Sequence, residues 1–217
     1  MIIWISGPYG VGKSTLAEAM AAKMENALIF DAEEVGNAVR GNYPDCPYGY
    51  IFEDYPLWGE FCYLLLKDVH EKFHKDILVP MTLLRAESYS IIEKLLQNGI
   101  DTRLVVLEAS YQTVHDRILA RGEEEGCWCM ENIELAREGS AALPGTHIQT
   151  DGKSVENLMD ELLTVHDAEF LLIISHPLCS KFTYLLYFLC SLLAVWNIRH
   201  LTEFISNIII SVSIRFN

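Results

Sequence analysis

Residues 2–15 read IIWISGPYGVGKST, a short apolar run followed by a glycine-rich turn that ends in Lys13 and Ser14. The turn fits the Walker A pattern G-x-x-x-x-G-K-[ST]. Small residues let successive backbone N–H groups converge on a phosphate, and the following helix points the positive end of its dipole at it. The stretch predicts a site for the phosphates of ATP, in which Lys13 binds the terminal phosphates and Ser14 binds magnesium. The predicted site is formed by Gly7, Pro8, Tyr9, Gly10, Val11, Gly12, Lys13, Ser14 and Thr15.

Apolar runs alternate with helix-forming stretches along the chain. The runs at 2–5, 27–30, 77–81, 102–108 and 147–150 are mostly continuous, as strands buried on both faces should be. Helices are expected at 13–25, 32–40, 57–75, 86–98, 111–122, 129–142 and 154–166. This alternation predicts the α/β class, a three-layer P-loop NTPase fold with a five-stranded, mostly parallel sheet. The stretch 42–56, rich in Pro, Gly, Asp and Tyr, is expected to be a long ordered loop.

Charge divides the chain into two parts. The 217 residues have a formal charge of -14, and residues 1–167 hold 13 of the 16 Lys and Arg and 28 of the 30 Asp and Glu. We therefore expect one domain, which contains the predicted ATP site, over 1–167 and an apolar segment over 168–217. The acidic domain argues against nucleic acid as a partner. The six cysteines form no C-x-x-C pair and the start resembles no signal peptide, which favours reduced thiols and a cytoplasmic location.

The apolar segment contains an uncharged run, FTYLLYFLCSLLAVWNI, at 182–198. Its length is at the lower limit for a helix that spans a bilayer. Three interpretations stay open. The run is a helical anchor that attaches the protein to the inner face of the membrane, a hydrophobic cap packed on the domain, or a C-terminus foreign to the fold, for instance from a shifted reading frame.

A second motif competes with the glycine turn. Residues 70–74 read HEKFH, which fits the zinc-peptidase signature H-E-x-x-H. On a helical wheel both histidines fall on the polar flank, and the sequence nominates no third ligand; the opposite, apolar face is formed by Leu57, Phe61, Leu64, Leu65, Val69 and Phe73. Two solvated histidines are the favoured interpretation. Cys127 and Cys129 likewise lack a second pair for a tetrahedral site and are interpreted as ordinary thiols.

Several charged residues are candidates for phosphoryl-transfer chemistry. The strand at 77–81 lacks the carboxylate of a Walker B motif, and Asp31, directly after ALIF, is the nearest replacement. It would hold magnesium or orient an acceptor hydroxyl, or it caps the next helix. Arg117 and Arg121 share one helical face, with Arg137 on the next helix, and would stabilise the transferred group from a closing flap, or form surface ion pairs. Arg40 would face the acceptor.

The order of these parts resembles the tunicamycin-resistance protein family, ATP-binding P-loop proteins related to small nucleotide and shikimate-type kinases. The resemblance covers about residues 1–166 and is carried by MIIWISGPYGVGKS, FDAEEVGNAVR, YPLWGEF, ILVPMT, HDRILAR and HIQTDGKSVENL. It implies an ATP site at Gly7 to Thr15, and a cleft over Asp31, Arg40 and the loop 42–56 for a uridine-containing nucleoside antibiotic or a similar molecule. It also implies that Asp151 begins the adenine-side loop, where a plain turn or cap is the alternative.

Two functions are compatible with these features. The first is an ATP- and Mg²⁺-dependent small-molecule or nucleoside phosphotransferase that confers tunicamycin resistance, with Lys13, Asp31, Arg117 and Arg121 as its catalytic residues. The second is a non-catalytic, ATP-dependent protein that sequesters the drug at the membrane. A P-loop alone does not distinguish transfer from binding.

Overall fold

The computed structural model describes residues 1–165, so the predictions for the apolar segment, including 182–198, lie outside the described residues. The strands are β1 (Ile2–Ser6), β2 (Ala27–Ile29), β3 (Asp76–Pro80), β4 (Thr102–Glu108) and β5 (Thr146–Gln149). The α-helices are α1 (Lys13–Lys23), α2 (Ala32–Arg40), α3 (Pro56–Phe73), α4 (Ser90–Gln97), α5 (Tyr111–Ala120), α6 (Trp128–Glu131), α7 (Ile133–Ala141) and α8 (Val155–Val165). Short 3-10 helices are η1 (Phe52–Asp54) and η2 (Ala86–Tyr89).

The five strands form one sheet in the order β2-β3-β1-β4-β5, and every pairing between them is parallel. The central strand β1 pairs Ile2 with Ile77 of β3 on one side and with Thr102 of β4 on the other. The predicted α/β fold with a five-stranded parallel sheet is therefore confirmed.

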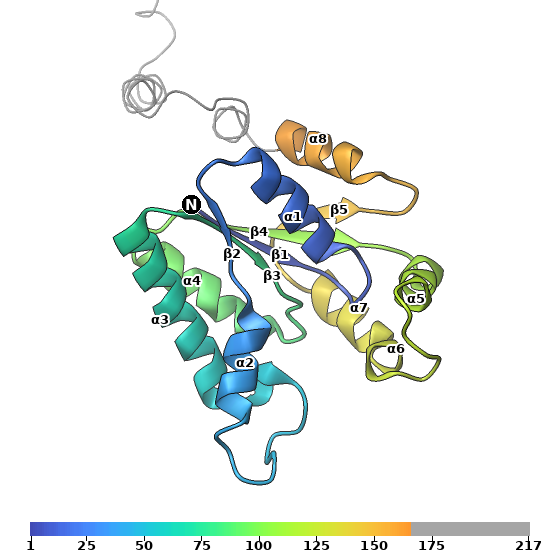
Figure 1. Cartoon of the computed structure of the whole chain (residues 1–217), viewed down its shortest axis with the longest axis horizontal. Helices are drawn as coiled ribbons and strands as arrows, with labels where there is room; N and C mark the ends of the chain where they lie inside the picture. The colour runs from blue at the N-terminus through green and yellow to red at the C-terminus, as the bar shows by residue number, and fades with distance from the viewer. Residues whose placement is uncertain (166–217) are drawn as a thin grey trace, which may run out of the picture. The chain divides into compact units, whose positions relative to one another are not determined.

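Side chains from alternate strand positions enter two separate cores, which is why the strands read as continuous apolar runs. Ile3 and Ile5 pack with α1 and α8 on one face, whereas Ile2 and Trp4 pack with α2, α3 and α4 on the other. Figure 1 shows these helices on the two sides of the sheet. The indole of Trp4 is fully buried and donates a hydrogen bond to the carbonyl of Met81 (3.0 Å).

The carboxyl ends of the strands lie at one edge of the sheet, and hydrogen bonds join the segments that leave them. The Thr82 hydroxyl, after β3, donates to the carbonyl of Gly7 after β1 (2.9 Å), and the Leu83 amide donates to Ser6 Oγ (2.9 Å). The Thr150 amide, after β5, donates to the Glu108 carbonyl at the end of β4 (2.8 Å). In a parallel α/β sheet this edge is where ligands bind.

The loop 42–55 is held by an aromatic cluster at its base. The rings of Tyr43, Tyr48 and Tyr55 contact one another edge to face, with centroids 5.3 to 5.7 Å apart. The Tyr55 hydroxyl also donates to the carbonyl of Gly49 (2.9 Å). Such edge-to-face contacts stabilise beyond simple burial, and here they give the loop a defined shape with η1 at its end.

Helix α3 differs from the simple amphipathic helix that the sequence suggested. The buried residues are Trp58, Cys62 and Leu66. Five residues of the predicted apolar face lie outward with 42% to 65% of their surface exposed: Leu57, Phe61, Leu64, Leu65 and Phe73. Trp58 takes the core position, where its indole donates to the Ala32 carbonyl (3.0 Å) and so has a buried partner.

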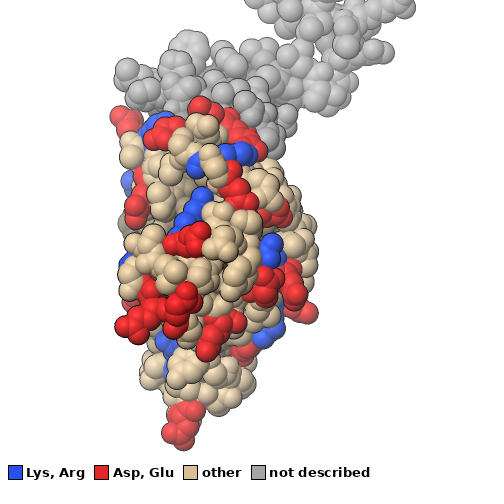
Figure 2. All heavy atoms as spheres, turned by 90° about the vertical axis from the view of Figure 1, so that its right-hand side faces the viewer, with Lys and Arg blue, Asp and Glu red and all other residues tan. Residues whose placement is uncertain are grey.

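Acidic side chains are widespread on the face of the molecule shown in Figure 2, with basic ones interspersed. This distribution matches the formal charge of -14. Within residues 1–165, no helix is both long enough and apolar enough to cross a bilayer.

Candidate functional site

The glycine turn (residues 7–14) connects β1 to α1 in a conformation that glycine permits. Gly7, Gly10 and Gly12 all have positive φ, and a Cβ on Gly7 would lie only 2.4 Å from the carbonyl oxygen of Leu107 in β4. Gly12 is the N-cap of α1 and has no side chain to cap it, so the amides of the first turn stay available. Pro8 and Val11 are buried, and Thr15 is exposed in the first turn of α1.

Lys13 lies over the turn that precedes it. Its Nζ donates to the carbonyls of Gly7 (3.0 Å) and Pro8 (2.9 Å), and it lies 5.7 Å from the centre of the Tyr9 ring. Burial, helped by the positive charge of Arg121, lowers the pKa of Lys13 to about 8, while the carboxylate of Glu33 opposes that change. The ammonium is therefore close to the turn and poorly solvated.

A cleft of about 620 Å³ adjoins the glycine turn. Its walls come from the turn, from α2, from loop residues 50–53, from the segment after β3 and from the segment 121–129. Six predicted site residues line it: Tyr9, Gly10, Lys13, Ser14, Arg40 and Arg121. The cleft thus brings the predicted phosphate site and the predicted acceptor loop together.

Asp31 has the position of a helix cap, one of the two roles predicted for it. Its Oδ1 accepts hydrogen bonds from the amides of Glu33 (2.9 Å) and Glu34 (3.2 Å), so Asp31 is the N-cap of α2. It is not among the cleft-lining residues that the structure describes. The capping interpretation therefore has a geometric basis, and the metal or acceptor role of Asp31 stays a prediction.

One face of α2 is polar and lines the cleft. Glu33, Asn37 and Arg40, at positions i, i+4 and i+7, all contribute to the wall. Arg40 Nη2 donates to Asn37 Oδ1 (2.9 Å), and its guanidinium lies 4.7 Å from the centre of the Phe52 ring. Arg40 therefore lines the cleft and links α2 to the loop, and its contact with an acceptor stays a prediction.

The segment 121–129 forms the opposite wall. Arg121 makes an ion pair with Glu123, whose carboxylate also accepts from the Cys127 thiol (3.1 Å). The Trp128 ring contacts the Tyr9 ring edge to face, with centroids 5.2 Å apart. This segment is thus tied to the glycine turn by an aromatic pair, and Arg121 faces the cleft with its charge balanced.

Arg117 supports the glycine turn from behind instead of lining the cleft. Its Nη1 donates to the Val11 carbonyl and to Thr150 Oγ1 (both 2.9 Å), and its Nη2 donates to the Thr150 carbonyl (3.2 Å). The fork of the guanidinium therefore joins the turn to the end of β5. Its predicted catalytic contact with a phosphoryl group stays a prediction.

Arg137 and Asp151 also lie away from the cleft walls. Arg137, on α7, donates to the Ala109 carbonyl (3.3 Å) and pairs with Glu134 (3.0 Å). Asp151 accepts from the Ser110 amide at the start of α5 (2.9 Å). Hydrogen bonds from Thr113 and Ser110 lower the pKa of Asp151. Both residues hold helices in place, and their predicted nucleotide contacts stay predictions.

Sequence reasoning assigned no role in the cleft to its three carboxylates, Glu33, Glu53 and Glu123. Glu33 follows the predicted Asp31 by two residues, and its spacing to Asn37 and Arg40 is the signal that could have identified it. Glu53 gives no such signal because it lies in an aperiodic loop. Burial raises the pKa of Glu53, while the hydrogen bonds that it accepts oppose the change.

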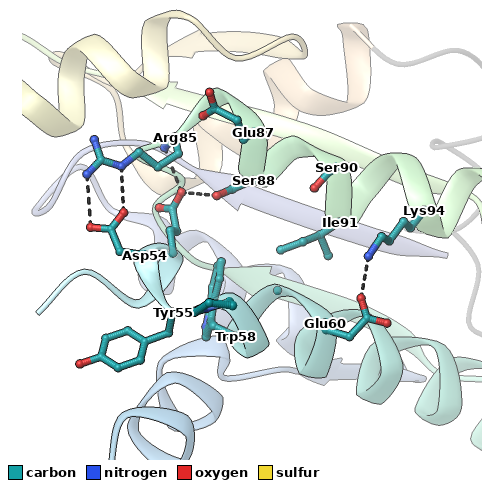
Figure 3. A pocket seen from close by; sticks show the side chains of 13 residues that line it. Asp54, Tyr55, Trp58, Glu60, Arg85, Glu87, Ser88, Ser90, Ile91 and Lys94 are labelled. Carbon is teal, nitrogen blue, oxygen red and sulfur yellow. Dashed lines mark hydrogen bonds and ion pairs between the residues drawn. The ribbon is translucent and has the colours of Figure 1, made fainter. Parts of the chain in front are cut away.

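Glu53 also borders a second cavity of about 460 Å³ between η1, α3, η2 and α4 (Figure 3). Its carboxylate accepts from the amides of Leu84 (2.6 Å) and Arg85 (2.9 Å) and from the Ser88 hydroxyl. Figure 3 shows the ion pair between Arg85 and Asp54 in the same wall. Glu53 therefore fastens the loop to the segment that follows β3.

The motif HEKFH lies at the end of α3. His74 has a left-handed backbone as the C-cap, so only His70 belongs to the helix, and its Nδ1 donates to the Lys75 carbonyl (3.0 Å). Among residues 1–165, no three His, Cys, Asp or Glu side chains come together as a metal site. For magnesium, the cleft offers the Ser14 hydroxyl, which fits an ion held mainly by phosphate oxygens.

Comparison with solved structures shows that small P-loop kinases share this fold. The tunicamycin resistance protein of Deinococcus radiodurans matches with a TM-score of 0.61 and 21% identity, over 76% of this chain and 94% of that protein. A sugar kinase from a Janibacter species matches with a TM-score of 0.55 and 17% identity, over 75% and 92% of the two chains. APS kinase CysC of Mycobacterium tuberculosis, solved with AMPPNP and APS, matches with a TM-score of 0.54 and 16% identity, over 76% of this chain and 95% of that protein.

No family model and no curated protein matches the sequence. The structural likeness confirms the expected resemblance to tunicamycin-resistance proteins and small kinases at the level of the fold.

Proposed function

We propose, from the P-loop kinase fold that the chain shares with a tunicamycin resistance protein and with small kinases, that it is an ATP-dependent phosphotransferase. Its acceptor would be a small hydroxyl-bearing molecule of the nucleoside type, with tunicamycin as the first candidate. One observation carries the proposal: a single cleft is lined by Lys13 and Ser14 at one end and by Arg40 and loop residues 50–53 at the other. Donor and acceptor would meet in this cleft.

The residues of the cleft suit the two ends of such a reaction. At the donor end, the amides of the glycine turn and the ammonium of Lys13 would bind the phosphates of ATP, and the Ser14 hydroxyl would hold magnesium. Arg121 would stabilise charge on the transferred group once the phosphate competes with Glu123 for its guanidinium. At the acceptor end, Tyr50 has 71% of its surface exposed and offers a ring on which a planar group stacks.

A second function has its own support. The segment after β3 presents Thr82, bonded to Gly7, where a Walker B carboxylate would lie, and Asp31 caps α2. A cleft that has a threonine after β3 and whose neighbouring Asp31 caps a helix suits an ATP-dependent protein that binds and sequesters the drug without transferring phosphate. Attachment to the membrane through residues 182–198 is compatible with either function.

The deciding experiment incubates the purified full-length chain with ATP, Mg²⁺ and tunicamycin and then measures the mass of the drug. A gain of one phosphate that is absent with Lys13→Ala supports the transferase. An unchanged mass together with retained drug binding overturns the transferase and supports sequestration. If the wild-type chain neither binds tunicamycin nor transfers phosphate to it, tunicamycin is excluded as the ligand.

Attachment to the membrane is tested separately by cell fractionation of the full chain beside a chain that ends at residue 167. Recovery of the full chain alone in the membrane fraction supports an anchor. Equal recovery of both chains in the soluble fraction contradicts it.

A further inference from the structure

The wall of the cleft that carries Arg121 also carries two thiols. Cys127 is the N-cap of the short helix α6 and Cys129 belongs to that helix, and both side chains are half-buried. Cys129 lines the cleft. By contrast, Cys62 is buried in the core under α3, and Cys46 is exposed. Cys127 and Cys129 are therefore two partly accessible thiols in one segment beside the predicted ATP site.

The carboxylate of Glu123 holds both sulfur atoms on one side of this segment. The Cys127 thiol donates to Glu123 Oε2 (3.1 Å), and the Cys129 thiol is hydrogen-bonded to the same carboxylate. These hydrogen bonds, that of Cys127 first, and the charge of Arg121 hold the pKa of Glu123 below its usual value. Because one carboxylate contacts both thiols, the two sulfur atoms are neighbours.

The backbone also brings the two cysteines within range of a disulfide. Trp128 between them is helical, and helix geometry separates Cα atoms two positions apart by about 5.4 Å. Disulfides join Cα atoms that are about 4.4 to 6.8 Å apart. Gly122 and Gly126, just before the pair, have positive φ, and a Cβ at either would meet no atom within 4 Å beyond its chain neighbours. The backbone before the pair is therefore loosely packed and has room to adjust.

We propose that Cys127 and Cys129 are an oxidative modification site: a peroxide converts them to a reversible intramolecular disulfide, and this bond lowers the affinity of the cleft for ATP. The effect on ATP rests on the proposed function, because it concerns regulation of the same cleft. Formation of the disulfide does not depend on that function.

The reaction balances with hydrogen peroxide as the oxidant. The thiolate of Cys129 attacks one peroxide oxygen, so that an S–O bond forms, the O–O bond breaks and the other oxygen leaves as water. The sulfur of Cys127 then attacks the sulfur of Cys129, an S–S bond forms, the S–O bond breaks and a second water leaves. The two sulfur atoms together lose two electrons to the peroxide, and the two waters take up the two thiol protons.

The surroundings of Cys129 set the pH at which it reacts. Burial and then the charge of Glu123 raise the pKa of Cys129, while the guanidinium of Arg121 opposes that change. Because the thiolate is the nucleophile, the thiol should react slowly near neutral pH and faster as the pH rises.

The disulfide would change two contacts of the cleft wall. Glu123 loses two hydrogen-bond donors and keeps Arg121, so a phosphate competes less well for that guanidinium. Trp128 lies between the two cysteines in the chain, and its ring contacts that of Tyr9 in the glycine turn (5.2 Å between ring centres). Movement of the two sulfur atoms therefore shifts the aromatic pair that ties the wall to the turn.

The test treats the reduced, purified full-length chain with hydrogen peroxide, alkylates the remaining thiols and maps the peptides by mass spectrometry. We expect a peptide containing residues 127–129 that has lost two hydrogens and carries no alkyl group. It should form faster at about pH 9 than at about pH 7. ATP affinity, measured by calorimetry at about pH 7, should fall by about fivefold or more on oxidation and return after treatment with a thiol reductant.

Two serine variants are the matched controls. Cys127→Ser keeps a hydroxyl that can donate to Glu123 but cannot form the disulfide, so peroxide should change its ATP affinity by less than about twofold. Cys46→Ser removes an exposed thiol and keeps the pair, so it should respond to peroxide as the wild type does.

The outcomes separate this inference from the proposed function. If Cys127 and Cys129 are both alkylated after peroxide treatment, or if Cys129 becomes a sulfinic acid without the S–S bond, the inference is wrong and the function stands. If the disulfide forms but ATP affinity stays within about twofold, its control of the cleft is wrong. If the reduced wild type binds no ATP, the proposed function and its regulation both fail, while the peptide map still decides whether the disulfide forms.

Discussion

Lys13 combines a positive charge with poor solvation, and the two properties together make its charge depend on pH. Burial lowers its pKa to about 8, far below the value of an exposed lysine. Because the lowered pKa belongs to the folded protein, the ammonium is present below about pH 8 and is lost as the pH rises through that value. The residue is therefore suited to bind phosphate near neutral pH.

We expect ATP affinity to be steady from pH 6.5 to 7.5 and to fall above pH 8, by up to about tenfold per pH unit, as Lys13 loses its proton. Isothermal calorimetry at several pH values measures this directly. Lys13→Arg is the control, because a guanidinium keeps its charge throughout this range. An affinity that is independent of pH up to pH 9.5 in the wild type would contradict the assignment.

Asp31 is a residue for which stability and catalysis are separable. Asp31→Ala removes the acceptor for the amides of Glu33 and Glu34, and we expect it to lower the free energy of unfolding by about 1 kcal/mol. Asp31→Asn keeps a capping oxygen and should lower the free energy of unfolding by less than Asp31→Ala does. Urea denaturation measures both. If Asp31→Asn folds normally but loses all phosphoryl transfer, the catalytic role predicted from the sequence is right and the cap is only part of its function.

At the scale of elements, α2 and the loop 42–55 meet at a point where no side chain fits between them. A Cβ on Gly36 would lie 2.3 Å from the ring of Phe52. The guanidinium of Arg40 lies over the same ring. The close approach fixes the distance between the two walls of the acceptor end.

Gly36→Ala should therefore push Phe52 away and destabilise the protein by about 1 to 3 kcal/mol, despite the better helix propensity of alanine. Gly59→Ala in α3 is the matched control, because its Cβ would meet Ile91 at an ordinary 3.4 Å, and it should be neutral or stabilising. Thermal unfolding measures these variants. A double-mutant cycle of Gly36→Ala and Phe52→Leu, singly and together, then isolates the contact between the two positions. Equal effects of the two glycine replacements would show that the contact with Phe52 is unimportant.

The sequence predicted the elements better than it predicted the site. Apolar runs located β1 to β5, and helix signals located every α-helix except that α6 and α7 were predicted as one helix over 129–142, because local periodicity reports burial but not a short break between helices. The sequence did not show that Trp58 enters the core while Leu57 stays exposed, because the residues that surround Trp58, including Ala32, come from other parts of the chain.

The glycine turn was identified from a motif and Arg40 from its place at the end of the second helix, and the structure places part of the turn and Arg40 in the wall of the cleft. The positions of Arg117 and Arg137 could not be read from helical spacing, because the carbonyls that they bind, Val11 and Ala109, come from other segments. Glu53 escaped notice for the same reason: its partners follow β3, 31 or more residues later in the chain.

At the scale of the whole molecule, the described residues 1–165 form a core on each side of the sheet. Both faces of the sheet are covered by helices within residues 1–165, and buried residues of the core extend to Leu162 in α8. The division into a domain over 1–167 and a segment over 168–217 is a prediction that follows naturally from this coverage.

A chain that ends at residue 167 should therefore unfold cooperatively, at a temperature within a few degrees of the full chain, and should bind ATP with similar affinity. Differential scanning calorimetry and nucleotide titration measure the two properties. A chain ending at Gly152, which lacks α8 and so uncovers part of one sheet face, is the control expected to lose stability. Failure of the chain of 167 residues to fold would show that the apolar segment belongs to the domain.

The edge-to-face contact between Trp128 and Tyr9 gives the molecule an intrinsic optical reporter. Trp128 is 38% exposed at the cleft, whereas Trp4 and Trp58 are at most 1% exposed, and Trp196 lies outside the described residues. With Trp196 replaced by Phe, acrylamide should quench the emission of one indole and spare two. Binding of a molecule next to Trp128 can then be measured as a change in the fluorescence of that single indole, without a label and before the molecule is identified.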